Sequence, residues 1–209
     1  GFNNQPSSNY YYLDFSNGFP DTIRHYRKMS FFITNASICD TAGNLLFYTN
    51  GEWIANADGD TLLNSQNFNP GYYTQYYSPV GLGFSQAALF LPFSDTSQFY
   101  YVVSESAEEF INKDSVLDAQ PFYLTYSIID ASLDSGRGGV LPNAKNINII
   151  NDTLLLGRIT ACKHANGRDW WVVVHKYYSD VYYKLLFTEN GVYGPYTQQI
   201  GSLFPAKIL

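Results

Sequence analysis

The chain of 209 residues is short of charge, of methionine and of long apolar runs. Charged residues make up 14% of it, about half the usual share, and Lys plus Arg (12) are outnumbered by Asp plus Glu (18). A nucleic-acid-binding protein concentrates positive charge, and here the basic residues gather only at Arg24, Arg27 and Lys28. We therefore exclude nucleic acid as a partner. No apolar run approaches the ~20 residues that cross a bilayer, so we expect no transmembrane segment.

Cysteine is also scarce. Cys39 and Cys162 are too few for a disulfide scaffold and lack the spacing of a metal site. We expect both thiols to be unpaired and buried, because they occupy equivalent places in separate repeated units. The first residues lack the basic and apolar stretches of a signal peptide. The chain therefore begins as a cytosolic protein without its Met or as a processed secreted protein, and its many Tyr, Asn, Ser and Gly residues favour the second.

Aromatic residues are abundant, at 18% of the chain with 19 Tyr and 15 Phe. They recur in strand-like runs separated by Asp, Asn, Gly and Ser. Three units share one pattern: a strand that begins with small residues, a polar turn, and a second strand of bulky residues. These units are 36–49, 87–103 and 159–174. Further strands are predicted at 122–129, 147–150, 181–187 and 198–200.

A small inner strand followed by bulkier outer strands is typical of a propeller blade, since only small side chains fit near the central axis. We predict one all-β region over residues 1–209, with about three antiparallel β-propeller-like blades. Their approximate bounds are 30–84, 85–152 and 153–201, with a further unit beginning at 202–209. Three blades do not close a ring. We therefore expect part of a larger propeller in a longer chain, and the alternative is a β-sandwich.

One segment resembles a known family. Residues 156–171 (LGRITACKHANGRDWW), with 36–40 (ASICD) and 43–51 (GNLLFYTNG), resemble the propeller-like N-terminal region of large secreted Bacteroidota proteins. The resemblance spans about residues 30–200, and NGRDWW is its most specific element. Those proteins commonly end in a type IX secretion sorting domain, which residues 1–209 do not include. The resemblance implies export to the cell surface or beyond. Its implied partners are other cell-surface or secretion-machinery proteins, or the rest of the same chain, and it implies no reaction.

Asp followed by Ser or Thr and then an aliphatic residue occurs five times, where roughly one occurrence is expected by chance. The pattern is similar to the acceptor site for O-linked glycans on exported Bacteroidota proteins. The alternative is that Asp-Thr and Asp-Ser simply form turns well. The candidate glycosylation sites are Thr22, Thr41, Thr61, Ser115 and Thr153.

Residues that could carry chemistry are few. His164, Arg168 and Asp169 surround one turn, where a His/Asp pair could serve acid–base chemistry. Such groups at a blade corner more often bond to the turn, so we predict a structural network. Residues 56–60 (NADGD) resemble the start of a calcium loop, but its twelfth position is Asn67 instead of Glu. An Asp-Gly turn explains the segment equally well, so we expect no cofactor, with calcium as the alternative.

Doubled tyrosines suggest a binding surface. The insertion at 69–77 is the best candidate for a contact loop, through Tyr72, Tyr73, Tyr76 and Tyr77, although these rings could instead fill space between blades. We predict a non-enzymatic, secreted or cell-surface module for protein–protein interaction or extracellular scaffolding. The alternative is a carbohydrate-binding or carbohydrate-active propeller, with carboxylates from loops around 105–118 and 130–134.

Overall fold

The computed structural model describes residues 10–201, except 16, 26, 96 and 113, together with residue 203. In this part of the chain the fold is all-β, with antiparallel sheets and two short helices, α1 (Tyr72–Tyr77) and α2 (Leu133–Gly136). None of the sheets closes on itself. The predicted start of a further unit at 202–209 lies outside the described residues, apart from residue 203.

Three sheets carry most of the strands, and each follows the chain as an antiparallel meander. The first sheet consists of β3 (Ala36–Cys39), β4 (Leu45–Thr49) and β5 (Ile54–Asn56). The second consists of β6 (Ala88–Pro92), β7 (Phe99–Glu105) and β10 (Tyr123–Asp130), with β11 (Gly139–Val140) and β12 (Ile147–Asn151) both paired to β10. The third consists of β13 (Leu154–Lys163), β14 (Trp170–Lys176), β15 (Val181–Thr188) and β16 (Gly191–Gln199).

Two separate hairpins complete the strands. They are β1 (Tyr10–Asp14) with β2 (Asp21–His25), and β8 (Glu108–Ile111) with β9 (Leu117–Gln120). The second hairpin is inserted between β7 and β10 of the second sheet.

The three predicted hairpins are present as β3–β4, β6–β7 and β13–β14. Local chemistry explains the first turn, where one carboxylate oxygen of Asp40 accepts the backbone N–H groups of Ala42 (2.9 Å) and Asn44 (2.8 Å). An all-β fold of antiparallel meanders is therefore confirmed.

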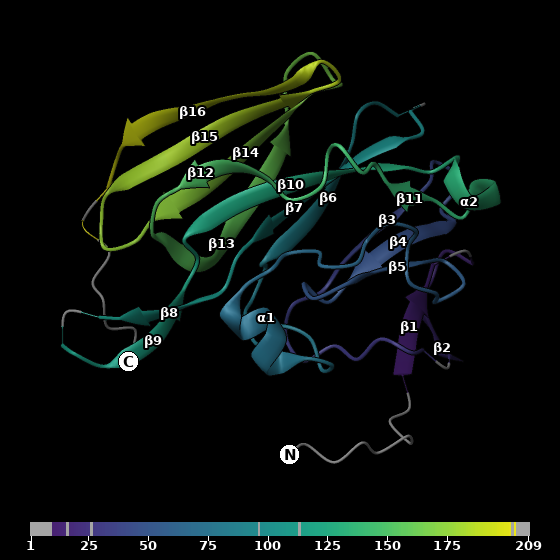
Figure 1. The fold of residues 1–209 in the computed structure, drawn as a ribbon. Coiled ribbons are helices and arrows are strands. Elements are labelled where there is room, and N and C mark those ends of the chain that lie inside the picture. Colours follow the sequence, from purple (N-terminus) through teal and green to yellow (C-terminus); the bar gives the residue numbers. More distant parts are fainter. Residues whose placement is uncertain are drawn as a thin grey trace.

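The second sheet lies between the other two, and both of its faces are covered (Figure 1). Alternation along β7 explains this arrangement, because successive side chains point to opposite faces. Tyr101 and Val103 pack toward the third sheet, whereas Tyr100 and Val102 pack toward the first. The two resulting apolar cores are the main source of burial in the fold.

The opening strands of the three sheets also lie close together. β3 contacts β6, and β6 in turn contacts β13. The opening strands of the three sheets are therefore neighbours, and β13 also contacts β7 and β9.

The prediction of buried thiols is wrong. Cys39 and Cys162 are unpaired, as expected, but both are exposed. The reason is that β3 and β13 are edge strands of their sheets, and each cysteine lies beside the turn that follows its strand. Neither side chain points into the cores between the sheets.

Candidate functional site

Residues 72–77 form helix α1 and not the irregular loop that the sequence suggests. Side chains four residues apart share a face of a helix. Tyr72 and Tyr76 are accordingly 49% and 61% exposed, whereas Tyr73 and Tyr77 pack against Phe84. Each doubled tyrosine thus places one ring outward and one inward.

The inward rings support the outward ones. Tyr73 and Tyr77 meet Phe84 edge-on, with ring centroids 6.2 and 5.8 Å apart. The outward rings of Tyr72 and Tyr76 lie nearly parallel, at an interplanar angle of 14° and a centroid distance of 6.3 Å. The helix therefore presents two flat rings on a packed base.

Two acids from β8 flank these rings. The backbone N–H of Tyr72 donates to Glu108 Oε2 (3.3 Å), and the negative charge of Glu109 raises the pKa of the Tyr72 phenol. The backbone N–H of Tyr73 donates to the carbonyl of Ala107 (3.0 Å), which ties α1 to the segment before β8. We call Tyr72, Tyr76, Glu108 and Glu109 the tyrosine patch.

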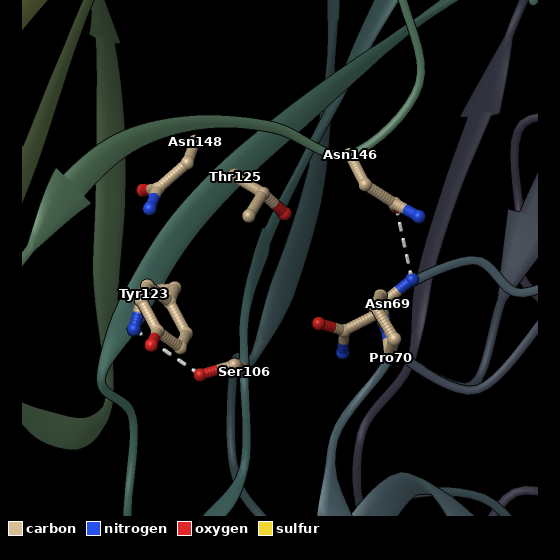
Figure 2. A pocket seen from close by; sticks show the side chains of 7 residues that line it. All are labelled: Asn69, Pro70, Ser106, Tyr123, Thr125, Asn146 and Asn148. Carbon is tan, nitrogen blue, oxygen red and sulfur yellow. Dashed lines mark hydrogen bonds between the residues drawn. The ribbon is translucent and has the colours of Figure 1, made fainter.

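A pocket of about 240 Å³ lies beside the segment that leads into α1 (Figure 2). Its lining is neutral throughout and consists of Asn69, Pro70, Ser106, Tyr123, Thr125, Asn146 and Asn148. No carboxylate, amine or imidazole contributes to these walls, so their chemistry is that of hydrogen bonding and ring contact.

The turn after β13 brings the three predicted residues together. Arg168 Nε donates to Asp169 Oδ1 (2.9 Å), and Asn166 Nδ2 donates to Asp169 Oδ2 (2.7 Å). His164 accepts the backbone N–H of Asn166 through Nδ1 (3.1 Å). The bond from Arg168 is the main cause of the lowered pKa of Asp169. All of these bonds lie within the turn and hold the start of β14.

The carboxylates of residues 105–118 lie in different environments. Glu105 is fully buried, and its Oε2 accepts the backbone N–H of Gly157 (2.9 Å) between β7 and β13. Burial raises its pKa to about 8. Glu109, Asp114 and Asp118 are exposed on the β8–β9 hairpin. Sequence proximity therefore does not pair Glu105 with these acids.

The acids near 130–134 bond locally. Asp130 Oδ1 accepts both the backbone N–H (2.9 Å) and the hydroxyl (2.7 Å) of Ser132. Asp134 forms an ion pair with Arg137 (2.9 Å). Both contacts hold the turn around α2.

The suggested calcium segment forms a turn after β5. Asn56 Oδ1 accepts the backbone N–H of Asp60 (3.0 Å), and the Asp60 carboxylate forms an ion pair with Lys28. Among the described residues no three His, Cys, Asp or Glu side chains form a metal-binding group.

The five glycosylation candidates lie in different surroundings. Thr22, Thr41, Thr61 and Ser115 are exposed, and Thr153 is half-buried. Beside Thr153, the Asp152 carboxylate accepts Lys176 Nζ (2.7 Å) and the Tyr183 hydroxyl, so this aspartate has a structural role.

Sequence reasoning missed the pocket. Asn69 and Asn146 adopt left-handed backbone conformations (φ 47° and 52°), which Asn tolerates better than most residues. Ser106 also lines the pocket, but no local sequence pattern shows that it lies near residues 146–148.

Comparisons with family models, with curated proteins and with solved structures found no match for this chain. Within the described part of the chain, the helices are too short and too polar to cross a membrane. The tyrosine patch and the pocket are therefore the features from which a function can be inferred.

Proposed function

We propose that this chain is a non-enzymatic module of propeller-like blades that acts through protein–protein contact at the cell surface. The observation that carries the proposal is the pair of exposed, nearly parallel rings of Tyr72 and Tyr76 on a packed base. Exposed aromatic side chains of this kind are the residues enriched at interfaces.

The chemistry of the patch favours a partner that presents arginine or lysine. A tyrosine ring attracts a cation above its face. Glu108 and Glu109 add negative charge beside Tyr72, in a chain whose formal net charge is −6. A basic side chain of a partner could therefore stack on a ring while it pairs with a carboxylate.

The propeller-like frame is supported by the meander order of the three sheets and by the contacts of β3 with β6 and of β6 with β13. Export by type IX secretion and the Bacteroidota origin rest on the family resemblance, and O-glycosylation rests on the five Asp-Ser/Thr motifs. The exposure of Thr22, Thr41, Thr61 and Ser115 supports glycosylation at those four sites.

The test is capture of partners from the surface fraction of the native source by the immobilised chain. The variant is Tyr72→Ser/Tyr76→Ser, and the matched control is Tyr193→Ser/Tyr196→Ser, since both control rings are 49% exposed. We expect the first variant to lose the partner and the control to keep it, with unchanged thermal unfolding in both. Added salt should weaken capture, because the contact is partly ionic.

Equal capture by both variants would exclude the tyrosine patch. Loss of the partner from the control variant alone would indicate that the partner binds the outer face of the third sheet. Polysaccharide cleavage that requires Glu108 or Glu109 would favour a carbohydrate-active enzyme instead.

A further inference from the structure

We propose that the pocket beside β10 binds one neutral sugar residue of a saccharide. This site is separate from the tyrosine patch and goes beyond the proposed protein contact. Its volume of about 240 Å³ is below the roughly 300–1,000 Å³ of sites for drug-sized ligands, so it suits a single small unit.

One wall of the pocket offers an acceptor. Asn69 is 1% exposed, and its Oδ1 is buried without a hydrogen-bond partner. Figure 2 shows this oxygen pointing into the space between Asn69 and Tyr123. A buried acceptor without a partner costs free energy, which a donor from a ligand would recover.

The facing wall offers a donor. Ser106 is 3% exposed, and its Oγ accepts the backbone N–H groups of Phe122 (3.2 Å) and Tyr123 (3.1 Å). A hydroxyl oxygen has two lone pairs and one proton, so these two bonds leave the O–H to donate. A sugar hydroxyl can both donate and accept a hydrogen bond. It could therefore donate to Asn69 Oδ1 and accept from the Ser106 hydroxyl.

The remaining lining fits a neutral sugar better than a charged ligand. Tyr123 is 37% exposed and contributes a ring at one side of the pocket (Figure 2). An aromatic ring offers a flat apolar surface to the C–H face of a pyranose. Because no lining residue carries a charge, a carboxylate or phosphate would find no counter-ion there.

The walls are held in place without a ligand. The backbone N–H of Asn69 donates to Asn146 Oδ1 (3.1 Å), and Asn69 Nδ2 donates to the carbonyl of Gly51 (2.9 Å). Asn146 Nδ2 donates to the carbonyl of Asn67 (2.7 Å). These bonds fix the orientation of the Asn69 amide, so binding requires little ordering of the protein.

The experiment screens the whole chain against an array of neutral oligosaccharides. Titration then follows with glucose, galactose, mannose and N-acetylglucosamine, observed through the side-chain amide signals of Asn69 and Asn148. We expect at least one sugar to bind and to shift these signals. Tyr123→Ala should weaken binding by about 10-fold or more, and Tyr123→Phe should retain it because the ring remains.

A second variant tests the acceptor. Asn69→Gly keeps the left-handed backbone and removes the amide, so it should abolish binding while circular dichroism still shows a β-fold. Tyr72→Ser/Tyr76→Ser should leave sugar binding unchanged, which separates this site from the tyrosine patch.

Three results would overturn the proposal. One is no binding and no shift with any neutral sugar. Another is sugar binding that Tyr123→Ala leaves intact. The third is occupation of the pocket by an unglycosylated peptide in preference to every saccharide tested.

Discussion

The two faces of the third sheet differ in what covers them. The inner face buries Val172, Val174, Leu185 and Phe187 against the second sheet. The outer face carries Trp171, Leu186, Tyr193 and Tyr196, of which the two tyrosines are 49% exposed. One sheet therefore holds apolar residues on both faces but buries only one of them fully.

The difference between the faces follows from the alternation of side chains along each strand. Along β15, Leu185 and Phe187 face inward and contribute to the core, while Leu186 between them faces outward. Residues that pair across strands lie on the same face of the sheet. Trp171 pairs with Leu186, and Leu186 pairs with Tyr193, so all three lie on the outer face. We therefore expect stability to come mainly from the inner rows, and substitutions of exposed side chains in the outer rows to leave the chain folded.

The sharpest test of this comparison replaces one ring on each face. Phe187→Ala should lower the free energy of unfolding by about 3–5 kcal/mol, because the ring is 1% exposed and meets Tyr101 edge-on (5.0 Å, 84°). Tyr193→Ala should stay within about 0.5 kcal/mol. Denaturant unfolding measures both, and equal losses would contradict the division between faces.

The burial of Glu105 predicts a pH dependence of stability. Its folded pKa of about 8 exceeds the ordinary value of 4.5, so the folded chain holds a proton that the unfolded chain has lost between these values. Stability is therefore complete below about pH 4.5 and falls as pH rises toward 8, by up to about 1.4 kcal/mol per pH unit.

Glu105→Gln removes this titration and keeps an oxygen to accept the N–H of Gly157. The variant should lose less stability than the wild type between pH 5 and pH 8, measured as the change in thermal midpoint. Glu109→Gln is the matched control, because this side chain is exposed. If the thermal midpoints of Glu105→Gln and of the wild type fall by the same amount between pH 5 and pH 8, the prediction is wrong and Glu105 is already ionised in the folded chain.

Helix α1 repeats the comparison on a smaller scale. Tyr77→Ala should destabilise the chain by about 1–3 kcal/mol, since its ring packs on Phe84. Tyr76→Ala should change stability by less than about 0.5 kcal/mol, because its ring is 61% exposed. A large loss from Tyr76→Ala would mean that the outward rings serve packing and not binding.

The smallest effect is expected at the cysteines. Both thiols are exposed, so iodoacetamide should modify Cys39 and Cys162 in the folded chain, with unfolding almost unchanged. Cys39 should react more slowly at neutral pH than an unperturbed thiol, because partial covering of the thiol and the nearby Asp40 carboxylate raise its pKa, and the thiolate is the reactive form. Intact mass reports the number of labels, and labelling only after denaturation would contradict the exposed positions.

The strands could be predicted from sequence where polar turns separate runs of β-branched and aromatic residues, as at Asp40–Asn44 between β3 and β4. Helix α1 could not, because tyrosine favours strands and six residues give too little periodicity to indicate a helix. Its inner rings pack against Phe84, which lies outside the predicted hairpin units, so the local sequence does not indicate this contact.

The candidate sites were predictable to different extents. The four tyrosines of residues 72–77 stand out by repetition, so the sequence identified the segment that carries the exposed rings. The pocket joins Asn69, Ser106 and Asn146, which are far apart in the chain. They meet through pairing of β10 with both β7 and β12 and through the left-handed turns at the two asparagines. No local sequence pattern indicates that these three residues come together in the fold.

The most direct test of the central claim is site-specific photocrosslinking in the native source. A benzophenone amino acid replaces Tyr76 in one variant and Tyr193 in another, so that two similarly exposed rings are compared. We expect a crosslink from position 76 to an arginine- or lysine-bearing segment of a surface protein, and none to that protein from position 193. The same adduct from position 193, or none from position 76, would contradict this expectation.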